Sequence, residues 1–231
     1  MPDNEIRADR EADTRMLHRM VFFSDAVFAI VMTLLVLDLR PPAATSEAVL
    51  RAGLVALAPT FGAFLMSFAL TGVFWFAHTT TTRRLVKFDP LVAVSNMLFL
   101  LIMTLMPFAS RLLGEDFNSP LIWQVYSGAL VCASASNILL VLAVNRGGGR
   151  LVGGVSTLEV VARVVRASAP GLAFSVGFWG ASEGRVIVPQ FCWALIPLVI
   201  LIGRLMHRAA QRPRTPPIET APEDRATGDA T

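Results

Sequence analysis

Three side chains with chemically reactive groups, Ser24, Asp25 and His78, lie inside long apolar stretches of the sequence. A hydroxyl, a carboxylate and an imidazole suggest an intramembrane enzyme, but no nucleophile motif surrounds Ser24. An ionisable side chain at membrane depth usually faces the interior of a helix bundle or a water-filled path. Asp25 lies only a turn or so inside the expected membrane boundary. There its negative charge can stabilise the positive N-terminal end of a helix, or it can reach Arg19. We therefore interpret Asp25 as an anchor that fixes its helix in a bundle, and we expect no enzyme.

The remaining candidate ligands do not suggest a metal or a cofactor. His18, His78 and His207 lack metal-ligand spacing. Cys132 and Cys192 each lie in an apolar stretch and are best interpreted as small buried hydrophobes. We expect no metal site and no cofactor, and we interpret His78, close to Trp75, as a hydrogen-bonded structural residue.

The composition indicates a membrane protein. Of the 231 residues, 54% are hydrophobic and only 16% are charged, and the mean hydropathy is +0.59. A helix needs about 20 predominantly apolar residues to cross the hydrocarbon core. Six stretches meet this requirement and predict an all-α integral membrane protein with six transmembrane helices, at residues 21–39, 54–77, 91–112, 121–144, 164–179 and 186–205. The fifth is the weakest because it is short and contains Pro170, while Pro59 either bends the second span or marks its start.

The distribution of Lys and Arg predicts the orientation. With six spans, sixteen of the twenty basic residues fall on one side of the membrane, and only Arg40, Arg51, Arg111 and Arg185 fall on the other. The positive-inside rule places both termini in the cytosol. The predicted organisation is a cytosolic N-terminal segment (1–20), a six-helix transmembrane domain (21–206) and a disordered cytosolic tail (207–231). Since the basic residues are explained as cytosolic rims, we expect no nucleic-acid partner.

The first predicted span carries an aliphatic stripe. At about 100° per residue, Ile30, Leu34 and Leu37 share a sector of roughly 60°, with Phe23 in the same sector and Thr33 beside it. Such a stripe either packs against lipid or another helix, or faces an ion path. Asp38, at the outer end of the span, is a candidate outer-mouth charge that draws cations toward a pore, and the alternative is a solvated charge paired with Arg40.

Three sequence motifs resemble the transmembrane protein 175 family, the lysosomal potassium channels and their prokaryotic relatives. Arg19-x-x-x-Phe23-Ser24-Asp25, followed by "AVFAIVMTLLVLDL", fits the family's first helix. The segments "FWFAH" (74–78) and "FDPLVAVSNMLFLLIMTLMPF" (88–108) extend the resemblance over the first half of the chain. One position departs from the family pattern, since members often have a second histidine where this chain has Thr79.

The resemblance implies a potassium-preferring cation channel in a bacterial plasma membrane. Prokaryotic members are homotetramers in which the first helix of each subunit lines a central pore. The matching constriction residues are Ile30, Leu34 and Leu37, and Thr33 matches a threonine layer associated with potassium preference. Arg19, Phe23, Ser24 and Asp25 match a cytosol-side anchoring network. The expected partners are potassium ions, the lipid bilayer and further copies of the chain.

A secondary transporter of a small solute or ion is the alternative. Such proteins are built from internal repeats with interrupted helices, and the sequence shows no convincing repeat, although Pro59 and Pro170 are candidate interruptions. The carbonyl filter sequence Thr-Val-Gly-Tyr-Gly of familiar potassium channels is also missing from the chain. A ring of carbonyls is therefore not encoded in that form, and we expect any potassium preference to be modest.

Overall fold

The computed structural model describes residues 2–43 and 45–210, and all regular structure within these ranges is helical. Six segments are long and apolar enough to cross a membrane, which confirms the predicted six-span, all-α fold: Arg10–Asp38, Ala58–Thr82, Pro90–Glu115, Pro120–Gly147, Thr157–Ser182 and Ile187–Arg208. The elements are α1 (Pro2–Leu34), η1 (Leu35–Asp38), α2 (Glu47–Ala56), α3 (Ala58–Thr82), α4 (Pro90–Met103), α5 (Met106–Glu115), α6 (Pro120–Gly149), η2 (Arg150–Val152), α7 (Thr157–Ser182), α8 (Ile187–Phe191), η3 (Cys192–Ala194) and α9 (Leu195–Ala210).

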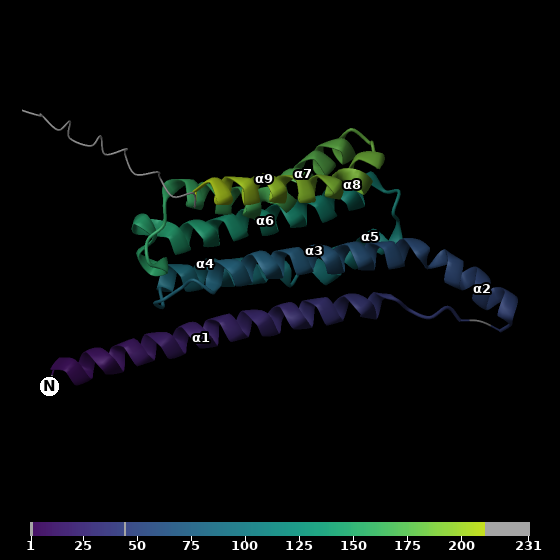
Figure 1. The fold of residues 1–231 in the computed structure, drawn as a ribbon. Helices are drawn as coiled ribbons and strands as arrows, with labels where there is room; N and C mark the ends of the chain where they lie inside the picture. The colour runs from purple at the N-terminus through teal and green to yellow at the C-terminus, as the bar shows by residue number, and fades with distance from the viewer. Residues whose placement is uncertain (1, 44, 211–231) are drawn as a thin grey trace, which may run out of the picture.

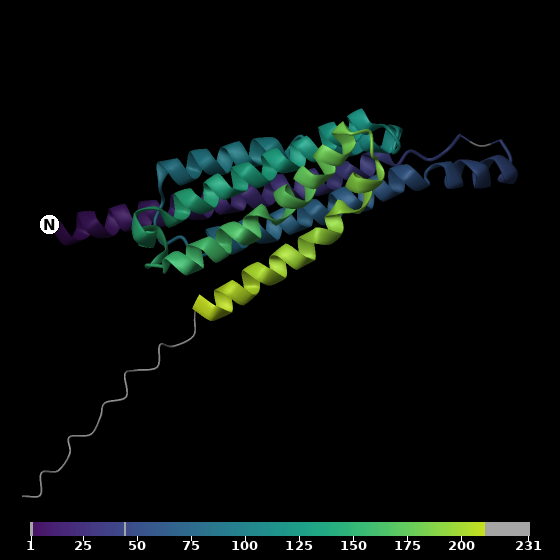
Figure 2. The same ribbon diagram turned by 90° about the horizontal axis from the view of Figure 1, so that it is seen from above.

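The helices form three layers, with α1 on one outer side. Figure 1 shows α1 beside α3, α4 and α5, while α6, α7 and α9 lie on the far side of that middle layer. Seen from above, α7 and α9 run side by side, and α2 projects from the end of the bundle that lies opposite the start of α1 (Figure 2). The start of α1 and the end of α9 lie at the same end of the bundle, as an even number of spans requires.

Several boundaries differ from the sequence-based expectation, and prolines explain two of them. Pro59 marks the start of α3. The third span is divided into α4 and α5, because Pro107 in the first turn of α5 has no N–H and its ring clashes with the carbonyl four residues earlier. In contrast, α7 continues through Pro170 and is a full-length helix of 26 residues, so the expectation of a short fifth span is wrong.

The predicted terminal segments differ in how far the structure describes them. The expected boundary at residue 20 falls inside α1, which runs unbroken from Pro2 to Leu34. At the other end, α9 extends to Ala210, so the first residues of the predicted tail are helical. The remainder of that tail, residues 211–231, lies outside the described residues.

Side-chain caps fix the helix ends at the basic end of the bundle. Asp89 accepts hydrogen bonds from the backbone N–H groups of Leu91 and Val92 at 3.0 and 3.1 Å and so caps α4. The second carboxylate oxygen of Asp89 forms an ion pair with Arg146 at the end of α6. Ser156 caps α7 by accepting from the N–H of Glu159 at 3.2 Å. The Asp89–Arg146 pair thus ties the start of α4 to the end of α6, whereas the Ser156 cap is local to α7.

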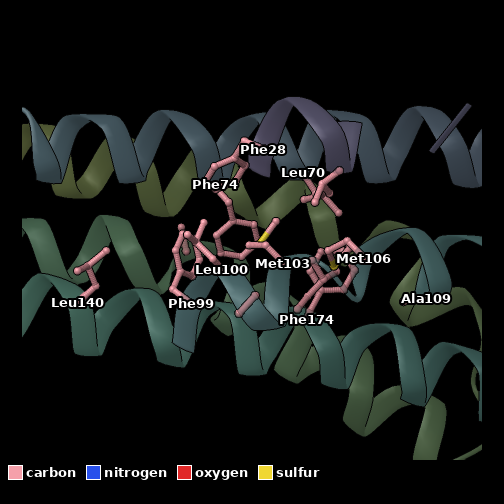
Figure 3. Close-up of a cluster of buried hydrophobic side chains, with 14 of the residues drawn as sticks. Phe28, Leu70, Phe74, Phe99, Leu100, Met103, Met106, Ala109, Leu140 and Phe174 are labelled. Carbon is pink, nitrogen blue, oxygen red and sulfur yellow. The ribbon is translucent and has the colours of Figure 1, made fainter. Parts of the chain in front are cut away.

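Large aromatic and aliphatic side chains fill the space between the layers. Figure 3 shows Phe28 of α1 and Phe74 of α3 pointing toward Phe99 and Met103 of α4. All four side chains are at most 1% exposed, and the ring centroids of Phe28 and Phe99 are 5.9 Å apart. Burial of such side chains stabilises helix packing through close van der Waals contact. This cluster fixes the rotation of α1 about its own axis, and thereby selects which residues of α1 face outward.

Candidate functional site

Helix α1 and η1 have one buried face and one uncovered face within the chain. The buried positions recur every three or four residues: Leu17, Met20, Ser24, Phe28, Val31 and Leu35 are all less than 9% exposed. The other face carries Ile30, Leu34 and Leu37, which are 57%, 42% and 67% exposed. The three predicted constriction residues therefore share one uncovered surface. Together with Thr33 on the same side, Ile30, Leu34 and Leu37 form what we call the α1 stripe.

A short 3-10 turn, η1, changes the register at the end of the stripe. The sequence predicts a continuous α-helix to residue 39, whereas the α-helical geometry ends at Leu34 and Leu35–Asp38 form the 3-10 turn. Side chains three residues apart are eclipsed in a 3-10 helix. Leu37 therefore lies almost directly in line with Leu34 along the helix axis. The change in geometry makes the stripe straighter than a continuous α-helix would.

Thr33 presents its hydroxyl on the same side of α1. Its Oγ1 donates a hydrogen bond to the carbonyl oxygen of Ile30 at 2.9 Å, and the residue is exposed. Because the hydroxyl proton is used within the helix, the lone pairs of Oγ1 remain available as acceptors. An oxygen with free lone pairs beside an aliphatic stripe is suited to contact a partly dehydrated cation.

A buried hydrogen-bond chain joins α1 to α4 and α3 behind the stripe. Asn96 of α4 donates through Nδ2 to Ser24 Oγ at 2.9 Å, and its Oδ1 accepts from His78 Nε2 at 2.7 Å. Ser24 Oγ in turn donates to the carbonyl oxygen of Met20 at 2.9 Å. Ser24, His78 and Asn96 are fully buried. Each side chain in this polar chain would be costly to bury without its partner.

Aromatic rings enclose His78. The imidazole stacks on Phe99, with an interplanar angle of 17° and a centroid separation of 5.8 Å, and Phe28 lies 5.7 Å from it on the side of α1. Since Asn96 Oδ1 can only accept, the histidine carries its proton on Nε2. The enclosed position and the fixed tautomer suit a structural role in joining α3 to α1 and α4.

Asp25 makes a second contact between α1 and α3. The indole N–H of Trp75 donates to Asp25 Oδ1 at 3.0 Å. Trp75 and His78 are three residues apart, on one face of α3. Trp75 bonds Asp25 directly, whereas His78 is linked to the preceding residue, Ser24, through Asn96. The structure thus brings the Phe-Ser-Asp motif and the Phe-Trp-Phe-Ala-His motif together.

The other two residues of the predicted anchor network lie apart from these contacts. Phe23 is 49% exposed, and Arg19 is exposed on α1. Within residues 2–43 and 45–210, Arg19 forms no ion pair, including none with Asp25. Both side chains belong to the uncovered face of α1 and take no part in the contacts that Ser24 and Asp25 make with α3 and α4.

Asp38 ends η1 at the opposite end of the bundle from the chain termini. Its carboxylate is half-buried, and one oxygen, Oδ2, has no hydrogen-bond partner within the described ranges. No ion pair joins Asp38 to Arg40 in this part of the structure. The alternative of a simple Asp38–Arg40 pair is therefore not the arrangement found here.

Sequence reasoning did not include Asn96 among the site residues. The signal was present, because an asparagine interrupts an otherwise apolar helix, where an unpaired amide is costly. For metals, the described residues contain no group of three or more His, Cys, Asp and Glu side chains placed to hold an ion. The site is thus an aliphatic surface held from behind by polar contacts.

Replacement of Asp25 by asparagine tests the anchor role. Asparagine can still accept from Trp75, but the hydrogen bond loses its charge assistance, so we expect a loss of about 1 kcal/mol in stability. Thermal unfolding should show a lower midpoint temperature, and size-exclusion chromatography should show a smaller fraction of assembled protein. The ion preference of the assembled protein should be unchanged. Asp13→Asn is the control, since Asp13 lies on the same helix and makes only a 3.8 Å pair with Lys87 at the surface. Normal assembly with altered ion preference would instead place Asp25 in the conduction path.

Comparison with known proteins agrees with the resemblance found in the sequence. Residues 19–107 match the family model described as "Endosomal/lysosomal potassium channel TMEM175". The chain is 32% identical over 117 residues to a protein named potassium channel from Streptomyces collinus, covering 49% of this chain and 57% of that protein. It is 29% identical over 120 residues to the endosomal/lysosomal proton channel TMEM175 of Mus musculus, covering 52% of this chain and 24% of that protein. The match therefore spans less than two thirds of either relative.

The fold is also similar to a solved structure over most of its length. The crystal structure of a lysosomal potassium-selective channel TMEM175 homologue from Chamaesiphon minutus superposes with a TM-score of 0.68 at 26% sequence identity. The match covers 82% of this chain and 98% of that chain. The similarity therefore extends into the second half of the chain, where the sequence motifs are missing.

Proposed function

Since residues 19–107 match the model of the TMEM175 potassium channels, we propose that this chain forms a potassium-preferring cation channel. Its pore would be lined by the first helix of each subunit. The observation that carries the proposal is the α1 stripe. Its aliphatic residues are left uncovered by the chain's own fold, although α1 is firmly fixed on its other face. A fixed helix with one uncovered aliphatic face suits a helix that meets its own copies around an ion path.

A single stripe encloses nothing, so the pore requires several subunits. Closed rotational symmetry brings the same surface of each copy to a common axis. We propose a homotetramer, which is the arrangement implied by the family resemblance. Ile30 side chains meeting at the axis would form a dewetting barrier to ions, with Leu34 and Leu37 continuing the narrow path. Small radial movements of α1 would then open or close it.

Thr33 in the α1 stripe would give such a pore a cation preference without a ring of backbone carbonyls. Thr33 places an acceptor oxygen one turn along the helix from Ile30. Four such oxygens would replace part of the hydration shell of a passing ion, at a lower cost for potassium than for the more strongly hydrated sodium ion. Asp38 would add negative charge at the outer mouth. Arg19 and Phe23, on the same face of α1, would contact neighbouring subunits at the cytosolic side.

Thr33→Ala tests the hydroxyl layer. We expect the potassium-to-sodium permeability ratio to fall about threefold, as a lost contact of about 0.7 kcal/mol predicts. Reversal potentials of proteoliposomes under two-ion gradients measure this ratio. Thr14→Ala is the matched control, because Thr14 is also exposed on α1 and makes the same kind of intrahelical bond, to Arg10. An unchanged ratio for Thr33→Ala would remove Thr33 from the ion path.

The charge distribution supports an orientation of the chain in the membrane, and the resemblance to prokaryotic channels implies the location. We propose that both termini, with the segments 1–20 and 207–231, lie on the cytosolic side of a bacterial plasma membrane, because the basic residues concentrate at that end of the spans. Proteolysis of sealed spheroplasts and inverted vesicles would measure the side on which each terminus lies. Cleavage of the tail in intact spheroplasts would contradict the assignment.

Flux through purified protein tests the activity itself. We expect potassium to move down its gradient across proteoliposomes, faster than sodium does under an equal gradient. The flux should not saturate at millimolar potassium. A proton-sensitive dye in the same vesicles measures whether protons pass. Slow, saturable uptake that requires a coupled solute would support a secondary transporter and contradict the channel.

A further inference from the structure

A groove of about 620 Å³ opens between α3 and the pair α7 and α9. Its apolar part is lined by Ala69, Gly72, Val73 and Phe76 of α3 and by Ile200 of α9. At its other end the groove is lined by four arginines, Arg84, Arg163, Arg166 and Arg204. The groove thus combines an apolar channel with a strongly basic end.

The basic end carries more positive charge than the acidic side chains of the described residues pair with. Glu159 forms ion pairs with Arg84 at 2.8 Å and with Arg163 at 2.7 Å. Arg163 is only 7% exposed and also donates to Asn145 Oδ1 at 2.7 Å, which makes it a structural residue. Arg166 and Arg204 form no ion pair within the described ranges. Two guanidinium groups therefore remain available to an anion at the groove.

The position of Arg166 is fixed by close packing between α7 and α9. A Cβ atom added at Gly203 of α9 would lie 2.4 Å from Cγ of Arg166, so the glycine leaves room for the arginine's aliphatic stem. The stem is held between the helices while the guanidinium reaches the groove. This arrangement differs from a freely moving surface arginine, and it gives the basic end a defined geometry.

The groove lies on the opposite side of α3 from the α1 stripe. Phe76 is two residues from His78, which corresponds to about 200° around the helix. His78 faces α1 and α4, so Phe76 and the groove face away from them. From Ala69 to Thr81 the lining follows α3 over twelve residues, or about 18 Å along the helix, and Arg84 lies just beyond the helix end. This length matches a lipid acyl chain, and the basic end lies at the predicted cytosolic surface.

We propose that this groove binds one anionic phospholipid of the cytosolic leaflet. The phosphate lies between Arg166 and Arg204, and one acyl chain runs along Gly72, Val73 and Phe76. Guanidinium groups pair well with phosphate oxygens, and basic pockets between transmembrane helices on the cytoplasmic side bind anionic headgroups. The site is separate from the proposed pore, so its test does not require ion conduction.

Native mass spectrometry of the full-length protein in mild detergent tests the headgroup contact. We expect retention of phosphatidylglycerol over phosphatidylcholine with the same acyl chains. The double variant Arg166→Gln/Arg204→Gln should lose phosphatidylglycerol affinity by about 25-fold, about fivefold for each arginine. The matched control Arg83→Gln/Arg208→Gln removes two exposed arginines at the same end that do not line the groove. Equal loss in both double variants, or equal retention of the two lipids, would overturn the proposal.

Gly72→Leu tests the acyl-chain contact independently. A Cβ atom at Gly72 meets nothing within 4 Å, so a larger side chain can enter the groove there without displacing the backbone. Gly62→Leu is the control, because Gly62 is equally open on the same helix but lies outside the groove. We expect only Gly72→Leu to reduce retention of phosphatidylglycerol. Equal affinity for glycerol 3-phosphate and for the lipid would show a simple phosphate site and overturn the proposal.

A photoreactive phosphatidylglycerol with a diazirine in its acyl chain identifies the occupant in proteoliposomes. We expect labelled peptides that contain residues 69–76 or Ile200. With the photoreactive group on the protein instead, benzoylphenylalanine in place of Ile200 should form a cross-link to the lipid. Cross-links from this position to residues 211–231, or to a second copy of the chain, would show that protein occupies the groove and would contradict the lipid site.

Discussion

Replacement of Ile30 by asparagine is expected to increase potassium flux through reconstituted protein about tenfold, which corresponds to a barrier lowered by about 1.4 kcal/mol. The expected cause is wetting of the constriction. Ile30 is 57% exposed on the uncovered face of α1, and an amide at this position would hold water where a ring of aliphatic side chains excludes it. Selectivity should fall at the same time, because a wetter path removes less of the hydration shell. Leu34→Ala should also increase potassium flux, but by less than Ile30→Asn.

Val36→Asn is the matched control for Ile30→Asn. Val36 is 48% exposed and aliphatic, but it lies one residue from Leu37 in η1, which is about 120° around a 3-10 turn. A polar side chain there does not face the proposed axis, so we expect flux close to that of the unsubstituted protein. A larger increase from Val36→Asn than from Ile30→Asn would place a different face of α1 in the ion path.

Asn96→Ala is expected to have the largest effect on folding. The substitution removes two hydrogen bonds and leaves His78 Nε2 without its buried partner. We expect a loss of about 2 kcal/mol in the free energy of unfolding, because stranded buried polar groups cost more than an average hydrogen bond gains. Thermal unfolding in detergent and the yield of assembled protein measure the effect. Potassium preference of the protein that still folds should be unchanged.

Asn137→Ala is the control for this substitution. Asn137 is also buried, and its Oδ1 has no hydrogen-bond partner in the part of the chain that the structure describes. The same truncation should therefore cost less than about 1 kcal/mol. If both alanine variants are equally destabilised, the loss comes from the cavity alone, and the Ser24–Asn96–His78 chain contributes nothing specific.

Hydropathy and charge were sufficient to predict the six spans, because a bilayer imposes a length and an apolar composition on each crossing segment. The position of Pro59 was also informative, since a proline fits the first turn of a helix. The consequences of Pro170 and Pro107 were not predictable in this way. The helix α7 continues through Pro170, whereas the third span is divided just before Pro107. Which proline breaks a helix depends on whether neighbouring helices hold the flanking turns together.

In the candidate site, too, the local sequence pattern predicts some features, while others depend on how the helices pack. The spacing of Ile30 and Leu34 places them on one face of any α-helix, and the structure finds that face uncovered. The 3-10 turn that aligns Leu37 with Leu34 has no clear signal in the apolar sequence around it. The side-chain partners of Asp25 and Ser24 are 50 and 72 residues distant along the chain. Long-range contacts of this kind follow from how α3 and α4 pack on α1, which no local motif encodes.

The most direct test of the central claim is chemical modification of a cysteine at Ile30 during flux measurement. The background carries Cys132→Ser and Cys192→Ala, which removes both native thiols. A positively charged thiol reagent reacts only where water reaches the thiolate. We expect Ile30→Cys to be modified and its potassium flux to be blocked, while Val36→Cys keeps its flux under the same treatment. An unmodified Ile30→Cys, or a modified one with full flux, would contradict a pore lined by α1.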